Sequence, residues 1–94
     1  MTTERIEAIR QRIVASLAPS ELEVTDESHL HRGHAGARDG RGHFRVRVVA
    51  ERFAGLDRLA RHRLVYDALG VLMQTDIHAL AISATTAAEG DERK

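Results

Sequence analysis

The sequence predicts an α+β domain in which helices pack on one face of a three-stranded sheet. Two observations lead to this fold class. Apolar residues recur at helical spacing in two segments of the chain, and they alternate with polar residues in three others. The segments follow one another as helix, strand, strand, helix and strand, with room for a short helix at the end. With 94 residues, the chain has the size of one small domain.

The first helix is predicted at the start of the chain. Thr2 or Thr3 can cap its first turn, and Pro19 ends it. Its inward stripe should consist of apolar residues spaced by three, four, seven and eight positions: Ile6, Ile9, Ile13, Val14 and Leu17.

Two strands are predicted next, over residues 22–26 and 43–48. In the second strand, Phe44, Val46 and Val48 fall on one face. We expect the two strands to be antiparallel. The segment between them, residues 28–42, holds four glycines and many polar side chains, which predicts a long loop that is either functional or disordered.

A second long helix and a third strand complete the predicted domain. Asp57 is a plausible N-cap for a helix with the inward stripe Leu59, His62, Val65, Tyr66, Leu69, Leu72 and Met73. After a turn at Thr75-Asp76, residues 77–84 form a strand in which His78 shares the phase of Leu80 and Ile82. A helix between the second and third strands predicts a right-handed parallel crossover. Thr86 to Glu89 fits a capping box with room for about one turn, so we expect a domain over 1–86 and a charged, flexible tail over 87–94.

The overall charge is zero, because 14 Lys and Arg balance 14 Asp and Glu. The charges are unevenly placed, however. Residues 29–63 hold nine Arg against three acids, a balance of plus six, and each flank has a balance of minus three. A basic middle attracts phosphates or acidic partners. No apolar run approaches a membrane span and the N-terminus is unlike a targeting segment, which predicts a cytoplasmic protein.

The chain has no cysteine, which excludes disulfides, thiol nucleophiles and a self-contained thiolate cluster. It also lacks a Ser-His-Asp order, a nucleophile elbow, a Walker loop and a paired-carboxylate signature, so no enzymatic activity is predicted. Gly33 to Gly36 matches the GxxG loop of KH domains, but here it lies between two predicted strands instead of two helices.

Six histidines are the candidates for ligand chemistry. His29, His31 and His34 could converge on a mononuclear metal such as zinc, but composition alone favours a solvated loop. For His43 we expect a surface or cross-strand role, and for His62 a packed structural role on its helix. His78 opens a strand whose in-phase members are apolar, so we expect it to be partly shielded, either as a satisfied core residue or as a ligand facing a cleft.

Six stretches of the chain together resemble the BolA family, over about residues 4–86. They are residues 22–28, 31–36, 43–49, 53–55, 61–66 and 77–82, and the pairing of Arg61-His-Arg with the downstream Ile77-His-Ala-Leu is the most specific part. The resemblance implies a class II KH-like fold in the order α-β-β-α-β-α, the same order that periodicity gives.

The family resemblance also implies a function. BolA proteins associate with monothiol glutaredoxins and share a [2Fe-2S] cluster, with the glutaredoxin Cys and a glutathione thiol ligating from one side. The implied ligands in this chain are His78 and a loop histidine, His31, with His34 as the alternate. The chain would be a monomer alone and a heterodimer with glutaredoxin, acting in cluster trafficking and iron homeostasis, with no cofactor held tightly by itself. Histidine ligation raises the potential of such a cluster and makes ligation sensitive to pH.

The resemblance implies a second function of a different class. BolA proteins are described as transcriptional regulators of stress response and cell morphology. DNA binding through the KH-like fold would use the basic middle of the chain, with Arg58, Arg61, Arg63, Arg45 and Arg47 as candidate contacts. The alternative for these arginines is a solvated strand or helix face.

Overall fold

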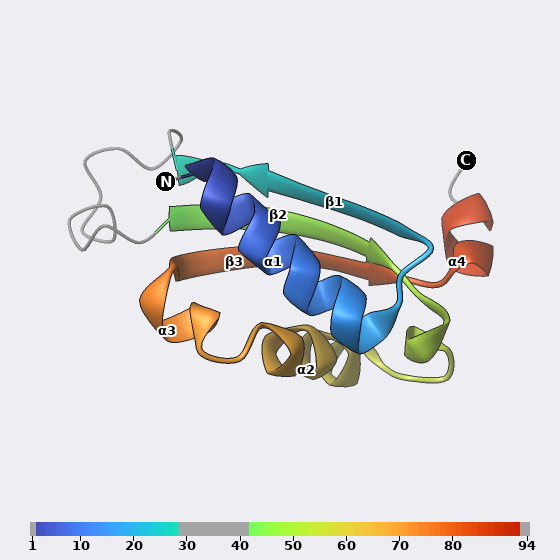
Figure 1. Cartoon of the computed structure of the whole chain (residues 1–94). Coiled ribbons are helices and arrows are strands. Elements are labelled where there is room, and N and C mark those ends of the chain that lie inside the picture. Colours follow the sequence, from blue (N-terminus) through green and yellow to red (C-terminus); the bar gives the residue numbers. More distant parts are fainter. Residues whose placement is uncertain (1, 29–41, 93–94) are drawn as a thin grey trace.

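The computed structural model describes residues 2–28 and 42–92. Its elements are α1 (Thr2–Leu17), β1 (Glu21–Asp26), β2 (Gly42–Val49), the 3-10 helix η3 (Glu51–Phe53), α2 (Arg58–Leu69), α3 (Leu72–Thr75), β3 (Ile77–Thr85) and α4 (Ala87–Glu92). The predicted α+β fold with a three-stranded mixed sheet is confirmed (Figure 1).

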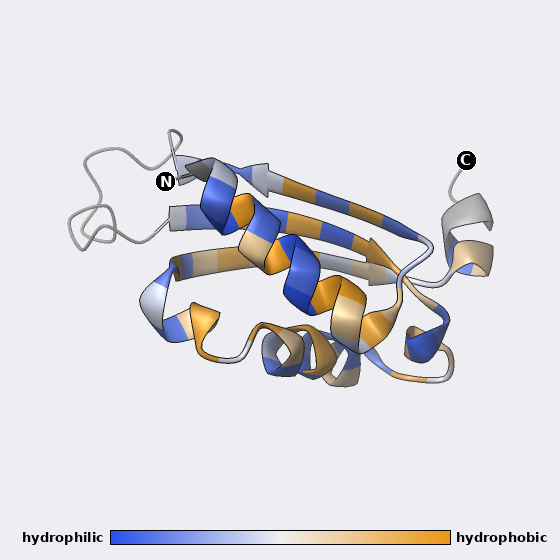
Figure 2. Ribbon diagram, in the orientation of Figure 1, coloured by the Kyte–Doolittle hydropathy of each residue, from blue (hydrophilic) through white to orange (hydrophobic). Residues whose placement is uncertain are grey.

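The strands lie in the order β1-β2-β3, so β2 is central and the other two are edge strands. β1 pairs with β2 in the antiparallel sense, and β2 pairs with β3 in the parallel sense, as predicted. Figure 2 shows the apolar and polar residues alternating along β1 and β2. This alternation gives the sheet one apolar face and one polar face.

The core lies between the apolar face of the sheet and the helices α1 and α2. Its fully buried members include Ile9, Ile13, Phe44, Val46 and Val65. Complete burial of such a side chain contributes about 1.5–3 kcal/mol relative to exposure. Figure 1 shows α1 lying across this face of the sheet, with α2 beside it. No described helix packs on the other face of the sheet, which carries Arg45 and Arg47.

The second long helix is shorter than predicted. α2 ends at Leu69, and Gly70 follows with a φ of 54°, a left-handed conformation that favours glycine. The amide of Gly70 donates to the carbonyl of Tyr66, and the chain turns into the separate helix α3. Leu59 and Tyr66 were predicted to face inward but are 59% and 41% exposed, because α2 turns Val65, Ala68 and Leu69 to the core. Val14 on α1 is likewise 49% exposed instead of inward.

The short helix predicted at the end of the chain is present as α4. It covers residues 87–92, within the segment that was expected to be a charged tail with room for about one turn. The predicted capping box is confirmed, since the amide of Thr86 donates to Glu89 Oε1 at 3.0 Å and the amide of Glu89 donates to Thr86 Oγ1 at 3.3 Å. Among the described helices, none has both the length and the apolar character to cross a bilayer.

Candidate functional site

A β-bulge at the start of β3 decides where His78 points. Gly42 pairs with Ile77 and His43 pairs with Ala79, so the strand register skips His78, which is the extra residue of the bulge on β3. A bulge of this kind re-aims side chains and is frequent beside functional sites. Here it places both Ile77 and Leu80 on the core side, while His78 and Ala79 are exposed.

The environment predicted for His78 is therefore wrong. Simple alternation puts His78 in phase with Leu80 and Ile82 and shields it, whereas the bulge shifts the phase by one residue and exposes the imidazole. Its ring lies against the ring of His43, with 5.1 Å between the ring centroids and an angle of 49° between the planes. His43 itself is buried, with 8% of its surface exposed. The structure thus brings together two histidines that are 35 positions apart in the sequence.

Hydrogen bonds fix the end of the sheet around His43. The His43 amide donates to Ser28 Oγ at 3.0 Å, and the Ser28 amide donates to Asp26 Oδ1 at 2.8 Å. The Glu27 amide donates to the His43 carbonyl at 2.7 Å. These bonds join the end of β1 to the start of β2, beside the histidine pair.

Gly42 allows this end of the sheet to close tightly. A Cβ at Gly42 would lie 2.6 Å from Phe44 Cε2 and 3.0 Å from Ser28 Oγ, closer than side-chain atoms normally approach. The Gly42 amide donates to the carbonyl of Asp76 at 2.9 Å, which ties β2 to the residue just before β3. A larger residue at position 42 would displace the Phe44 ring from the core.

His29, His31 and His34 lie outside the described residues, as does the Gly33 to Gly36 motif. Their chain segment, residues 29–41, starts directly after Ser28 and ends directly before Gly42. Both of these anchor residues are next to His43 in the structure. Within residues 2–28 and 42–92, no group of three or more His, Cys, Asp or Glu has the arrangement of a metal site.

The opposite end of β3 holds Arg61 in a network of internal contacts. Its two terminal nitrogens form a bidentate pair with Glu89, with Nη2 at 2.7 Å from Oε2. Arg61 Nε donates to the Leu56 carbonyl at 2.9 Å, and Nη1 donates to the Ala84 carbonyl at 3.1 Å. The hydrogen bonds to Glu89 raise the pKa of Arg61 against the opposing effect of burial. With 12% of its side chain exposed, Arg61 ties α2, β3 and α4 together, a geometry that does not favour the predicted DNA contact.

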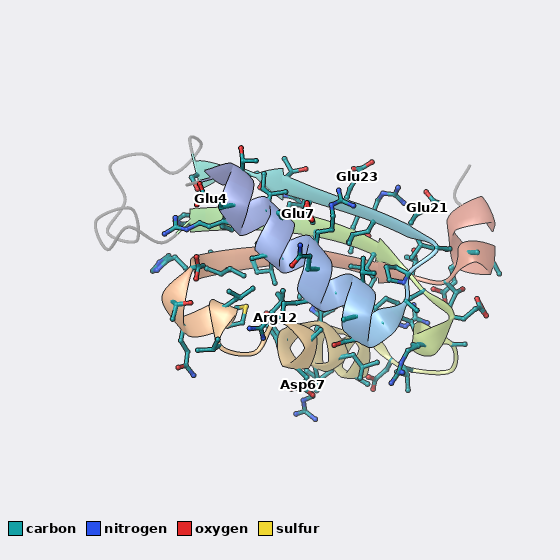
Figure 3. The ribbon with its side chains drawn as sticks, in the orientation of Figure 1. Glu4, Glu7, Arg12, Glu21, Glu23 and Asp67 are labelled. Carbon is teal, nitrogen blue, oxygen red and sulfur yellow. The ribbon has the colours of Figure 1, made fainter. Side chains whose placement is uncertain are left out.

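Arg45 and Arg47 lie on the face of the sheet opposite α1 and α2 and pair with acidic residues. Arg45 Nε is 2.9 Å from Glu27 Oε2, and Arg47 Nη2 is 3.0 Å from Glu21 Oε1 and 3.6 Å from Glu23 Oε2. Figure 3 shows Glu21 and Glu23 extending from β1 away from α1. The hydrogen bond from Arg47 to Glu21 raises the pKa of Arg47. Both arginines have the exposure expected of a solvated strand face.

Arg58 and Arg63 remain the accessible arginines of α2, and both are exposed. Among the described residues, no carboxylate forms an ion pair with either of them. His62 is partly exposed instead of packed in the apolar stripe.

Comparison with known proteins agrees with this fold. The chain is 44% identical over 86 residues to SufE-like protein 1, chloroplastic/mitochondrial, of Arabidopsis thaliana, covering 86% of this chain and 23% of that protein. It is 45% identical over 85 residues to BolA-like protein 1 of Mus musculus, covering 90% of this chain and 60% of that protein. The chain thus spans less than two thirds of the length of these two relatives.

Solved structures give the same result. The BolA domain of SufE1 from Arabidopsis thaliana superposes with a TM-score of 0.80 at 41% identity, covering 90% of this chain and 94% of that one. The solution structure of BolA1 from Mus musculus superposes with a TM-score of 0.78 at 43% identity, covering 95% of this chain and 70% of that one. The family model described as BolA-like protein matches residues 13–89. The chain therefore belongs to the BolA-like protein family.

Proposed function

We propose that this protein contributes histidine ligands to a [2Fe-2S] cluster that it shares with a monothiol glutaredoxin and glutathione, in iron-sulfur cluster trafficking. The observation that carries the proposal is the bulge, which exposes His78 beside His43 at the end of the sheet. An exposed imidazole on a paired strand is accessible to a metal held by another protein, and its backbone is fixed in position.

The chemistry of the donors fits a shared cluster. A [2Fe-2S] cluster has four terminal ligands, and two histidines on one iron can replace two thiolates, as in Rieske centres. In the proposal, glutaredoxin and glutathione supply two sulfur ligands and this chain supplies two imidazoles. The cluster is cargo that passes between partners, so incomplete ligation by this chain alone is part of the proposed role.

His31 is the proposed second ligand, and His34 is the alternate. His31 is three residues after Ser28, whose hydroxyl accepts a hydrogen bond from the His43 amide. Three residues span at most about 10 Å of extended chain, so the backbone of His31 stays within reach of this end of the sheet. His34 is six residues from Ser28 and eight from Gly42, which gives it a longer reach.

The test is a spectroscopic titration with a monothiol glutaredoxin loaded with its cluster in the presence of glutathione. Adding the parent protein should change the visible absorption and circular dichroism spectra until one equivalent is bound. His78→Ala should abolish this change, and either His31→Ala or His34→Ala should abolish it as well. His29→Ala, which removes a histidine two residues before His31, is the matched control and should titrate like the parent.

Two results would contradict the proposal. Spectra of His78→Ala identical to those of the parent would remove His78 from the cluster. If all three loop variants titrated like the parent while His78→Ala did not, His78 would ligate but the second ligand would not come from His31 or His34.

DNA binding remains a prediction. Of the five candidate arginines, Arg58 and Arg63 are exposed and form no ion pair with a described carboxylate, while Arg61, Arg45 and Arg47 are engaged by glutamates. Direct regulation requires duplex binding that weakens steeply with salt and prefers particular sequences. Binding that shows neither property would eliminate this function.

A further inference from the structure

A groove of about 800 Å³ lies at the far end of β3 from His78. Its walls come from the start of α2, the end of β3 and α4. Four consecutive residues of β3, Ile82 to Thr85, line it on one side, and Arg58, Arg61, His62 and Glu89 complete it. The groove therefore runs along a stretch of strand, which is the shape that an extended chain would fill.

The part of β3 that lines this groove lies on an edge strand in the order β1-β2-β3, and no described strand pairs with its outer side. The Thr85 carbonyl accepts from the Ala50 amide, on the side of β2, while the Ala84 carbonyl accepts from Arg61, on the opposite side. Because the backbone groups of successive strand residues point to opposite edges, those of Ile82 share the direction of Ala84, away from β2. Such an edge is a template for an added strand.

The charge of the groove favours an acidic occupant. Arg58 is exposed and, within the described part of the chain, has no acidic partner. The neighbouring Arg61 holds the carboxylate of Glu89, another wall residue, through both oxygens, so the net positive charge of the lining residues is that of Arg58. The described residues that line the groove include no Phe, Tyr or Trp, and His62 is the one ring among them on which a base could stack, whereas single-stranded nucleic-acid sites typically stack several successive bases.

We propose that this groove binds an extended acidic peptide segment of another protein, which adds as a strand to the outer edge of β3 and places a carboxylate on Arg58. Main-chain hydrogen bonds to Ile82 would hold the segment, and Arg58 would select for acidic side chains. The inference does not depend on the cluster ligands, because His78 is at the other end of the strand.

The probe is a fluorescein-labelled peptide of four Val-Glu repeats, whose alternation suits a strand with one acidic face. Binding is followed by fluorescence anisotropy and by amide chemical shifts. The shifts should change at residues 82–85 and at Arg58, and not around His43 and His78. Arg58→Glu should weaken binding about tenfold. Arg63→Glu makes the same charge change on an exposed residue of α2 that does not line the groove, and it should weaken binding far less.

Two further probes test whether main-chain hydrogen bonds hold the peptide and whether the partner is a peptide or a nucleic acid. A peptide N-methylated at alternate residues on its pairing edge should lose binding, because it cannot donate to the strand edge. Equal effects of Arg58→Glu and Arg63→Glu, or full binding by the N-methylated peptide, would overturn strand addition in the groove. A ten-residue oligo-dT that shifts residues 82–85 and displaces the acidic peptide would assign the groove to nucleic acid and overturn the proposal as well.

Discussion

The polar side chains at the two ends of strand β3 differ in their exposure and in their internal contacts. At its start, a bulge exposes His78 next to the buried His43. At its end, Arg61 contacts the strand through the Ala84 carbonyl and is held by Glu89 and the Leu56 carbonyl. Arg61 has 12% of its side chain exposed, whereas His78 is among the exposed residues of the strand.

The difference separates the stabilising role of Arg61 from the ligand role proposed for His78. A charged group that is satisfied by internal partners stabilises the fold and has little capacity left for a ligand. An exposed ring at a bulge adds little to stability but can reach a partner. We therefore expect substitutions at the far end of β3 to lower the free energy of unfolding, and substitutions of His78 to change binding alone.

The largest expected effect comes from the residue directly before His78. Ile77 is 1% exposed, because the bulge keeps it in phase with the core. Ile77→Ala should lower the free energy of unfolding by about 3 kcal/mol through lost burial and a residual cavity. Urea denaturation followed by far-UV circular dichroism measures this loss. A change below about 1 kcal/mol would mean that Ile77 does not occupy the core position that the bulge assigns to it.

Arg61→Ala should have the next largest effect. The substitution removes four hydrogen bonds from the guanidinium and leaves the Leu56 and Ala84 carbonyls without that donor. Because Glu89 is 40% exposed and can be solvated, we expect a loss of about 2 kcal/mol. The same denaturation experiment on Arg63→Ala, an exposed arginine of the same helix, should show a change within about 0.5 kcal/mol. Equal losses for the two variants would contradict the structural role of Arg61.

Thr86→Ala should have a smaller effect. It removes the side-chain acceptor of the capping box at the start of α4, while the pair between Glu89 and Arg61 remains. We expect a loss of about 1 kcal/mol, together with faster amide hydrogen exchange at Glu89. Unchanged exchange at Glu89 would show that the capping box does not hold this helix.

Deletion of His78 should affect stability least. Without the extra residue, Ile77, Ala79 and Leu80 pair in regular alternation with Gly42, His43 and Phe44, and the core side chains keep their positions. The free energy of unfolding should stay within about 1 kcal/mol of the parent value, as it should for His78→Ala. Both variants should nevertheless lose the spectral change with cluster-loaded glutaredoxin. A variant that is severely destabilised would show that the bulge is structural.

The candidate site shows which of its properties could be predicted from sequence patterns and which could not. His78 was identified as a ligand candidate through the resemblance of its strand segment to the BolA family, but its exposure was not predicted. Alternation assumes a regular strand, and the extra residue opposite Gly42 and His43 becomes visible only when the two strands are paired. For the same reason His43 was assigned a general surface or cross-strand role, since nothing in its own strand indicates a contact with His78.

The sequence by itself determined the order of the elements, the N-cap at Asp57 and the capping box at Thr86, because each depends on residues close together in the chain. The order of the elements in turn predicted the antiparallel and parallel strand pairings. Only the tertiary structure decided which side chains are exposed. The bulge at His78 and the pairing of Arg61 with Glu89 each follow from packing between elements distant in the sequence. Local periodicity carries no information about such contacts, and they are the ones that expose His78 at the start of β3 and bury Arg61 at its end.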